Sequence, residues 1–241
     1  VMQQRFHADS RVRTAEPLLF ERIPPMLSET FLSPNPDRPA ARRIEVTASE
    51  LPTVRVNTED TVIPRSQLLS NGDYSVMITN AGGGYSPWRD FDITRWPADT
   101  TRDACGSFVY IRDLNSGQIW SAAYHPIDRP ERRYSATFSW DRVEFRRRDT
   151  KVETLMEVFV SPEDDAEIRR LTFINSSSQT RHLELTSYVE LALAPHGSDR
   201  AHPAFSKLFV QTEAWPEKHA LLSSRRSRSP EDPPIWAGHV V

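Results

Sequence analysis

The residues best suited to chemistry lie in one short segment between positions 79 and 96. Three of the eight glycines of the chain stand there in a row, Gly82, Gly83 and Gly84. Glycine is costly in a strand and is kept where the backbone turns through positive φ or where another group approaches closely. Aromatic, hydroxyl and charged side chains follow the glycines: Tyr85, Ser86, Trp88, Arg89, Asp90, Arg95 and Trp96. Aromatic rings that stack on the C–H face of a pyranose, beside Arg and Asp that bond pairs of hydroxyls, are the components of a carbohydrate subsite.

The same segment also has a purely structural interpretation. A Gly-rich turn with a polar flank forms the corner of many β-sandwiches, and Asp90 could pair within the protein with Arg89 or Arg95. A phosphate-binding loop is excluded, because no Gly-Lys-Ser/Thr follows the glycines. The residues alone therefore leave a sugar subsite and a structural corner both open.

The remaining polar groupings favour structural roles. The seven histidines include His196 and His202, but no pair has a tight metal-ligand spacing, so a loop role is the better interpretation. Asp164 and Asp165 follow a Ser-Pro pair and indicate a turn rather than an acid–base couple. The single cysteine, Cys105, excludes an internal disulfide and a cysteine-based zinc site. We expect neither a metal nor another cofactor.

Two arginine-rich runs raise the question of a nucleic-acid partner, Arg146-Arg147-Arg148 and Arg225-Arg226-Ser227-Arg228. On a strand, Arg146 and Arg148 share one face and Arg147 the other, and acidic residues surround them. A solvated protein surface is therefore the better interpretation of the run. The net charge of −3, from 30 basic and 33 acidic residues, also lacks the basic excess of a nucleic-acid binder. We expect no nucleic-acid partner.

The elements that must position these residues are predominantly strands. From Arg43 onward, apolar residues alternate with polar ones, as in half-buried strands. The expected strands lie near 44–46 and 54–56, and at Tyr74–Thr79, Ser107–Asp113, Ile119–Tyr124, Ala136–Ser139, Val143–Arg148, Val152–Val160, Glu167–Asn175, His182–Leu193, Ala204–Thr212, Ala220–Arg225 and 235–241. Short turn signals separate them, which predicts antiparallel sheets packed face to face in one large β-sandwich over residues 41–241.

The first 40 residues differ from the rest. Prolines recur every few residues between Pro24 and Pro39, so we expect an irregular or helical linker or wrapping arm over residues 1–40. The chain opens on Val1-Met2 and closes on a strand-like stretch, so we expect an excised piece of a longer protein. With 26% charged residues and no run of roughly 18 apolar residues, this piece has the composition of a soluble domain.

Two of the expected strands are long and two-faced. In 152–160 and 183–193, apolar residues recur on one face and Glu or Thr on the other. Long curved sheets of this kind can form a concave polar groove, which is a natural surface for sugars. A plain solvated face is the competing interpretation.

Several blocks carry a resemblance to a known family. They are 80–95 with its Gly-Gly-Gly-Tyr-Ser-x-x-Arg-Asp motif, 106–113 (Gly-Ser-Phe-Val-Tyr-Ile-Arg-Asp), 117–121 (Gly-Gln-Ile-Trp-Ser), 152–193 and 202–210. The first three resemble the N-terminal β-sandwich of glycoside hydrolase family 94, which contains cellobiose, chitobiose and related disaccharide phosphorylases. The last two are most similar to the cyclic β-1,2-glucan synthases, and so is the opening 4–24. The resemblance covers nearly the whole chain.

This resemblance implies a supersandwich of galactose-mutarotase-like topology that precedes a helical (α/α)6 barrel. In the family the barrel carries the general acid and the phosphate site, so this chain is expected to be catalytically inactive alone and to meet phosphate only through the barrel. The Gly-rich loop implies an acceptor-side sugar site with Tyr85, Ser86, Arg89, Asp90 and Arg95, whereas Trp88 matches a position that varies. The implied partners are a glucan or gluco-oligosaccharide, the intramolecular barrel and a second copy in a homodimer. The implied location is a cytoplasmic-facing domain of a bacterial inner-membrane protein.

Two rival functions remain open at this stage. The sandwich could serve only to dock the barrel or to form a dimer, with no sugar contact. Alternatively it could be an aldose-epimerase-like enzyme, which would require a His and a Glu that converge in the concave groove as an acid–base pair.

Overall fold

The computed structural model describes residues 53–58, 61, 64–95, 105–129, 133–201, 203–227 and 234–241. These residues all belong to Ala48–Val241, the second of two units into which the chain divides. The expected arm over residues 1–40, the expected strand at 44–46, and Trp96 and His202 lie outside the described residues.

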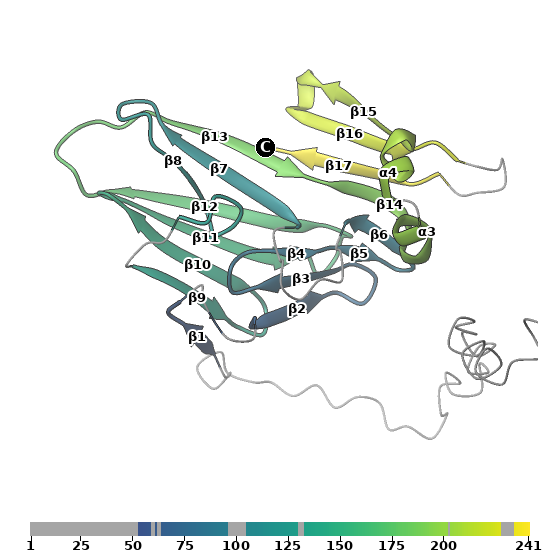
Figure 1. Ribbon diagram of the computed structural model, residues 1–241, viewed down its shortest axis with the longest axis horizontal. Coiled ribbons are helices and arrows are strands. Elements are labelled where there is room, and N and C mark those ends of the chain that lie inside the picture. Colours follow the sequence, from purple (N-terminus) through teal and green to yellow (C-terminus); the bar gives the residue numbers. More distant parts are fainter. Residues whose placement is uncertain are drawn as a thin grey trace, which may run out of the picture. The chain divides into compact units, whose positions relative to one another are not determined.

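A five-stranded antiparallel sheet forms one layer of the sandwich (Figure 1). Its strands, in spatial order, are β1 (Val54–Val56), β9 (Tyr134–Phe138), β10 (Val143–Asp149), β11 (Val152–Val160) and β12 (Glu167–Asn175). In β10, every second side chain from Val143 to Asp149 is buried, as expected for a strand with one face on a core. The sequence boundaries of β11 and β12 are confirmed to the residue.

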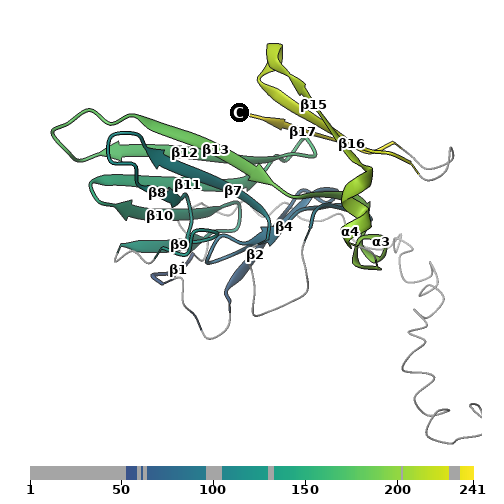
Figure 2. The ribbon, with the colours of Figure 1, turned by 45° about the horizontal axis from the view of Figure 1, so that its top comes forward.

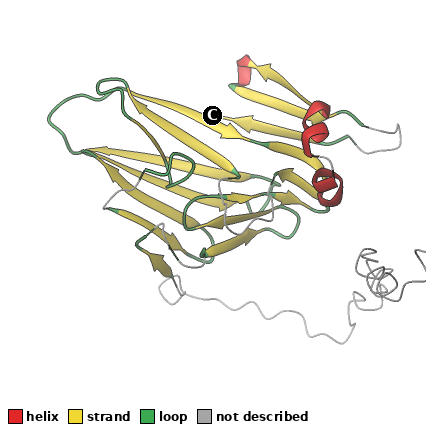
Figure 3. Cartoon of the chain, viewed as in Figure 1, coloured by secondary structure: helices red, strands yellow, loops and turns green. Residues whose placement is uncertain are grey.

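Four three-stranded sheets complete the described part of the fold, and all of their pairings are antiparallel. The first is β2 (Ser66–Ser70), β3 (Ser75–Thr79) and β4 (Gly84–Tyr85); the second is β14 (Leu191–Pro195), β6 (Phe91–Thr94) and β5 (Pro87–Trp88). The third is β13 (Leu183–Val189), β7 (Ser107–Asp113) and β8 (Ile119–Ser121); the fourth is β15 (Val210–Trp215), β16 (Ala220–Arg225) and β17 (Trp236–Val240). The prediction of an all-β antiparallel fold is confirmed (Figure 3).

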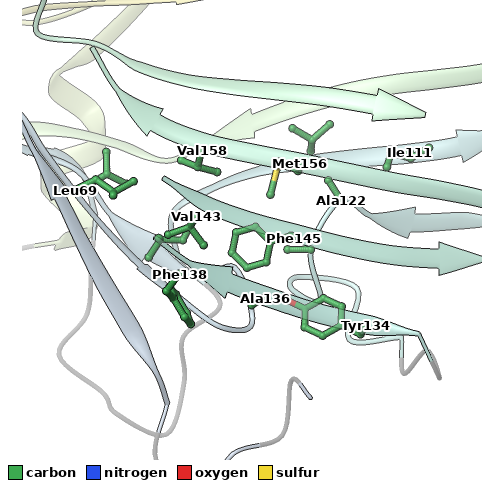
Figure 4. Packing of buried hydrophobic residues seen from close by; sticks show 14 of the residues in the cluster. Leu69, Ile111, Ala122, Tyr134, Ala136, Phe138, Val143, Phe145, Met156 and Val158 are labelled. Atoms are coloured by element: carbon green, nitrogen blue, oxygen red, sulfur yellow. The ribbon is translucent and has the colours of Figure 1, made fainter. Parts of the chain in front are cut away.

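The apolar core lies between the five-stranded sheet and strands β2, β3, β7 and β8. The five-stranded sheet contributes Tyr134, Ala136, Phe138, Val143, Phe145, Val152, Met156 and Val158, and the facing strands contribute Leu69, Val76, Ile78, Val109, Ile111 and Trp120. Figure 4 shows Phe145, Met156 and Ala136 together in this layer. Burial of these side chains supplies the main driving force for the face-to-face packing.

The predicted strand at His182–Leu193 is wrong in one respect, because it is two strands. β13 pairs with β7, whereas β14 pairs with β6, and the chain changes sheets at Glu190. Leu193 has φ +49°, and the β14–β6 register shifts between Leu191 and Ala194. A pattern with period two cannot reveal such a change of partner, because both strands alternate in the same way.

The predicted strand at Ala204–Thr212 is wrong over its first two thirds. The chain there forms the helices α4 (Pro203–Ser206) and η3 (Lys207–Phe209), which follow α3 (His196–Ala201), and β15 begins only at Val210. Figures 1 and 2 show α3 and α4 near β14 and β16. The remaining described helix is the single turn η4 (Pro216–Lys218), and none of the described helices is long and apolar enough to cross a membrane.

A buried ion pair stands inside the sandwich, where the sequence predicted only a solvated arginine run. Arg147 and Asp149 both have fully buried side chains, with Arg147 Nε donating to Asp149 Oδ2 at 2.6 Å and Nη2 to Oδ1 at 2.8 Å. Arg147 Nη1 donates to the Ala123 carbonyl at 2.6 Å. The prediction of a solvated surface holds for Arg146 but is wrong for Arg147, which is buried. The sequence alternation had placed Arg147 on the opposite face of the strand from Arg146, and that face is the one turned to the core.

Replacing Arg147 by Met should destabilise the domain strongly, because Asp149 would keep a buried charge without its bidentate partner. We expect a loss of about 3–5 kcal/mol in the free energy of unfolding, measured by chemical denaturation. Arg146→Ala is the matched control, since Arg146 is exposed and should change stability by less than about 0.5 kcal/mol. An Arg147→Met variant as stable as the wild type would show that the pair does not hold the core.

Candidate functional site

Gly82 and Gly83 lie in a buried turn between β3 and β4, and Gly84 is the first residue of β4. Gly82 has φ +93°, and a Cβ at this position would collide with the side chain of Ala123. A Cβ on Gly84 would collide with the carbonyl oxygen of Met77. The sequence expectation of positive φ and close approach is therefore confirmed for these two positions.

The backbone of this turn is bound within the domain. Thr79 N donates to Gly83 O at 2.8 Å, and Gly84 N donates to Cys105 O at 2.6 Å. On its other side, His125 N donates to Ala81 O at 2.9 Å. The turn thus joins β3 to the segments before β7 and after β8, which gives the glycines a structural reason.

Ser86 lies below the surface in a polar network. Its side chain is buried, and its Oγ donates to Glu167 Oε2 at 2.5 Å. Tyr74 Oη donates to the same oxygen at 3.2 Å, and Arg169 Nε donates to Glu167 Oε1 at 2.8 Å. Arg169 Nη1 also donates to Ser107 O at 2.7 Å, so the network ties β12 to β7 and to the segment after β4.

The network keeps Glu167 ionised. Burial opposes the charged form, yet the Arg169 charge and the hydrogen bonds from Ser86, Arg169 and Tyr74 outweigh it and lower the pKa of the Glu167 carboxyl. The same surroundings raise the pKa of Tyr74, through burial first and the Glu167 charge second. Tyr74 therefore stays a hydrogen-bond donor across the physiological range.

At the turn between β5 and β6, Arg89 and Asp90 are exposed, and Trp88 is half-buried against the core. Trp88 pairs with Phe91 in the register, so Arg89 and Asp90 are the two residues of the turn. We call these residues, with the adjoining Asp73 and Asp165, the hairpin cluster. It carries an aromatic ring, a guanidinium and three carboxylates.

Internal contacts hold the aromatic ring and the cation of the hairpin cluster. Trp88 Nε1 donates to Asp165 Oδ2 at 2.6 Å, and the Arg89 guanidinium carbon lies 4.8 Å from the centroid of the Trp88 ring. Arg89 Nε donates to Asp73 Oδ1 at 3.2 Å, although both side chains remain more than half exposed. Asp90 is exposed, and within the described residues no hydrogen bond or ion pair joins it to a neighbour.

Arg89 adopts a backbone conformation that is uncommon for its type. Its φ is +51°, and its N–H donates to Asp73 O at 2.8 Å. The first position of a two-residue hairpin turn with positive φ normally favours glycine. Arg89 therefore occupies this turn at a backbone strain of about 1–3 kcal/mol.

Arg95 lies at the other end of β6 and takes no part in the hairpin cluster. It donates from Nε and Nη2 to the two carboxylate oxygens of Asp199, both at 2.7 Å, and from Nη1 to Glu190 Oε1 at 2.9 Å. The hydrogen bonds to Asp199 raise the pKa of Arg95, and they lower the pKa of Asp199 despite its burial. This bidentate pair attaches α3 to β6.

The structure thus separates the sequence-predicted site residues into three groups. Trp88, Arg89 and Asp90 share one surface, and Tyr85 is half-buried on the preceding strand β4. Ser86 and the glycine turn lie beneath, and Arg95 lies elsewhere. Sequence reasoning missed Asp73, and it interpreted Asp165 only as part of a turn. No local signal could have linked Asp73 and Asp165 to Trp88, because these residues are far from Trp88 in the sequence and come close to it only in the folded domain.

Several of the histidines that the structure describes pair with a neighbouring side chain. Among the described residues, no group of three or more His, Cys, Asp or Glu side chains could hold a metal ion. His196 Nδ1 lies 2.6 Å from the buried Asp92 Oδ2, and His125 pairs with Asp128. Both of these pairs contain Asp, whereas the epimerase hypothesis requires Glu.

A family model described as "Glycosyl hydrolase 94, supersandwich domain" matches residues 49–241. The chain is 34% identical over 242 residues to cyclic beta-(1,2)-glucan synthase NdvB of Rhizobium meliloti (strain 1021), covering 100% of this chain and 8% of that protein. It is 26% identical over 156 residues to N,N'-diacetylchitobiose phosphorylase of Vibrio proteolyticus, covering 63% of this chain and 20% of the phosphorylase.

A third relative is solabiose phosphorylase of Paenibacillus borealis, which is 31% identical over 86 residues, or 36% of this chain and 11% of that one. The chain therefore spans a fifth or less of the length of each of these relatives.

Gly84→Ala should destabilise the domain, because the new methyl group would meet the Met77 backbone, which cannot move without breaking the β3–β4 pairing. We expect a loss of about 1–3 kcal/mol in the free energy of unfolding, measured by thermal or chemical denaturation. Gly197→Ala is the matched control, since nothing lies within 4 Å of its added Cβ. Equal stability of the two variants would contradict the close-packed turn.

Glu167 should contribute to the acid sensitivity of the domain. Its pKa is lower in the folded than in the unfolded protein, so its stabilising effect is complete above the unfolded value of about 4.3 and is lost as the pH falls through the folded value. Unfolding free energies measured from pH 7 to pH 3 should therefore fall less steeply for Glu167→Gln than for the wild type. Parallel curves would show that Glu167 titrates alike in both states.

Proposed function

The chain belongs to the glycosyl hydrolase 94 supersandwich family, and on that premise we propose that it is the carbohydrate-binding β-sandwich domain of a cyclic β-1,2-glucan synthase or a related disaccharide phosphorylase. In this proposal residues 41–241 form the sandwich and residues 1–40 are an arm that leads into it. A family match over residues 49–241 and a relative that spans the whole chain support this assignment.

The hairpin cluster is the sugar-contacting part of the proposed site, and its composition is the observation that carries the proposal. Trp88 offers a ring whose orientation is held by the bond to Asp165 at 2.6 Å. Arg89, whose guanidinium carbon lies 4.8 Å from the ring centroid, and Asp90 both have exposed side chains. A pyranose needs an apolar surface for its C–H face and paired polar groups for its hydroxyls, and ordering the ring in advance reduces the entropic cost of binding.

The other residues of the predicted site have supporting roles in the proposal. Tyr85 supplies a second half-buried ring near the start of the segment. Ser86 and Gly82–Gly84 position the hairpin, since their polar groups are bound within the domain. Arg95 anchors the far end of β6 through Asp199.

We assign the bond-breaking chemistry to a helical barrel that acts together with this sandwich. In an inverting phosphorolysis, phosphate attacks the anomeric carbon while one protein carboxyl protonates the departing oxygen, so a single protein acid is sufficient. The hairpin cluster then contributes to the acceptor side, where the departing sugar is held. The proposed setting is the cytoplasmic side of a bacterial inner membrane.

A second function, docking or dimerisation without sugar contact, is favoured by a different observation. The sheet β15–β16–β17 exposes large apolar side chains, Trp215, Leu221, Trp236 and Val240. Exposed apolar groups of this size are typical of protein contacts. Sedimentation of the chain at several concentrations distinguishes this function, because a docking surface without sugar binding gives association but no saccharide response.

Arg89→Gly offers a sharp test of the sugar site. Glycine suits the positive φ at this turn, so the variant should fold at least as stably as the wild type while it loses the guanidinium. In calorimetric titration with β-1,2-gluco-oligosaccharides, we expect binding to weaken by about tenfold, as for loss of one or two charge-assisted hydrogen bonds.

Arg146→Ala is the control, since it removes an exposed arginine on another sheet and should bind like the wild type. Unchanged affinity in Arg89→Gly, or no wild-type response at millimolar ligand, would overturn the proposed sugar role of the hairpin cluster.

A further inference from the structure

We propose that the sheet β13–β7–β8 carries a second saccharide-binding surface, separate from the hairpin cluster, on the face turned away from the core. The proposal rests on the proposed function for the class of ligand, and on the geometry of this face for its location. Val109 and Ile111 of β7 point into the core, so the alternate residues Tyr110 and Arg112 point to the opposite face.

The register of the sheet brings polar and aromatic side chains together on this face. Tyr110 lies opposite Thr186, and Arg112 lies opposite Glu184. On the other side of β7, Arg112 lies opposite Ile119, which adds an aliphatic edge. These five residues line a hollow of about 230 Å³.

The charges in the hollow favour a neutral ligand. Arg112 Nη1 lies 3.5 Å from Glu184 Oε2, and both side chains are more than half exposed. One cation and one anion cancel, which offers no net attraction to a phosphate or to a cationic ligand. An exposed pair of this kind contributes little to stability, so the two groups are available to donate to and accept from neighbouring hydroxyls.

Two tyrosine rings supply the apolar part of the surface. Thr186 lies opposite Tyr110, and Tyr188 is two residues further along β13. Tyr188 is therefore the diagonal neighbour of Tyr110 on the same face of the sheet. Tyr188 is 47% exposed. Burial raises the pKa of Tyr110, with the neighbouring Tyr188 as a second cause. Two rings beside a balanced Arg–Glu pair suit a chain of pyranoses, which presents C–H faces and hydroxyls in alternation.

The hollow and the hairpin cluster lie toward opposite ends of β7. Ser107, at the start of β7, accepts a hydrogen bond from Arg169 of the Glu167 network that underlies the hairpin cluster. Arg112 is five residues further along β7, roughly 16 Å away. The strands β7 and β13 run side by side over this length (Figure 1). Only a glucan of several sugar residues is long enough to contact both surfaces. Such a glucan should bind more tightly than a disaccharide, because binding at one surface raises its effective concentration at the other.

The test is an NMR titration of the full chain with β-1,2-gluco-oligosaccharides of increasing length, read at the backbone amides of β7, β13 and the β5–β6 turn. We expect shifts on β7 and β13, with the apparent dissociation constant read there weakened about tenfold in Arg112→Ala and in Tyr188→Ala. Arg146→Ala is the matched control for the first variant, because Arg146 is equally exposed and lies 3.6 Å from Glu153. Trp140→Ala controls for loss of an exposed ring.

The readout at two places separates the two proposals. Shifts at the β5–β6 turn alone, or shifts on β7 and β13 that survive both variants, would overturn the second surface and leave the hairpin cluster standing. Shifts on β7 and β13 alone would support the second surface and count against the hairpin cluster. Saturation by inorganic phosphate at the same amides would overturn the assignment to a neutral saccharide.

Discussion

The buried pair of Arg147 and Asp149 is the interaction to which the glycine turn and the neighbouring strands are connected. An arginine inside an apolar core is costly unless its donors are paired, and here Nη1, the nitrogen that does not bond Asp149, donates to the Ala123 carbonyl. That bond holds the segment after β8 against β10. The Ala123 side chain is in turn the group against which Gly82 packs, and His125 in the same segment donates to Ala81. The ion pair is thus connected to the glycine turn through the segment that holds Ala123 and His125.

The hairpin cluster is positioned by the glycine turn and by the network around Glu167. The glycine turn leads directly into β4 and β5, and the network around Glu167 attaches Ser86 to β12. The β2–β3 turn is bonded to the β11–β12 turn next to the hairpin cluster. Asn71 Nδ2 donates to Ser161 O at 3.0 Å and to Asp164 O at 2.9 Å. Exposed Arg89 and Asp90 therefore stand on a rigid support. Such support is what a binding site needs, because groups ordered in advance lose less entropy when a ligand arrives.

The arginine-rich composition acquires a physical meaning in the structure. Arg95, Arg147 and Arg169 each bond a carboxylate within the domain. A planar guanidinium suits such sites because it can donate two parallel hydrogen bonds, which an ammonium cannot do. Arg89 and Arg112, by contrast, remain largely exposed beside Asp73 and Glu184. The same residue type thus serves as an internal connector and as a surface donor.

The sequence by itself determined the all-β class, the long strands β11 and β12, and the need for glycine at positions 82 and 84. These features depend on local alternation and on backbone sterics, which a single segment carries within it. Only the tertiary structure decided that Arg147 is buried, that the chain changes sheets at Glu190, and that residues 204–209 are helical. It also decided that Trp88 meets Asp165 while Arg95 lies apart. Each of these depends on partners distant in the chain, and a pattern of period two is the same whichever strand, carboxylate or core lies opposite.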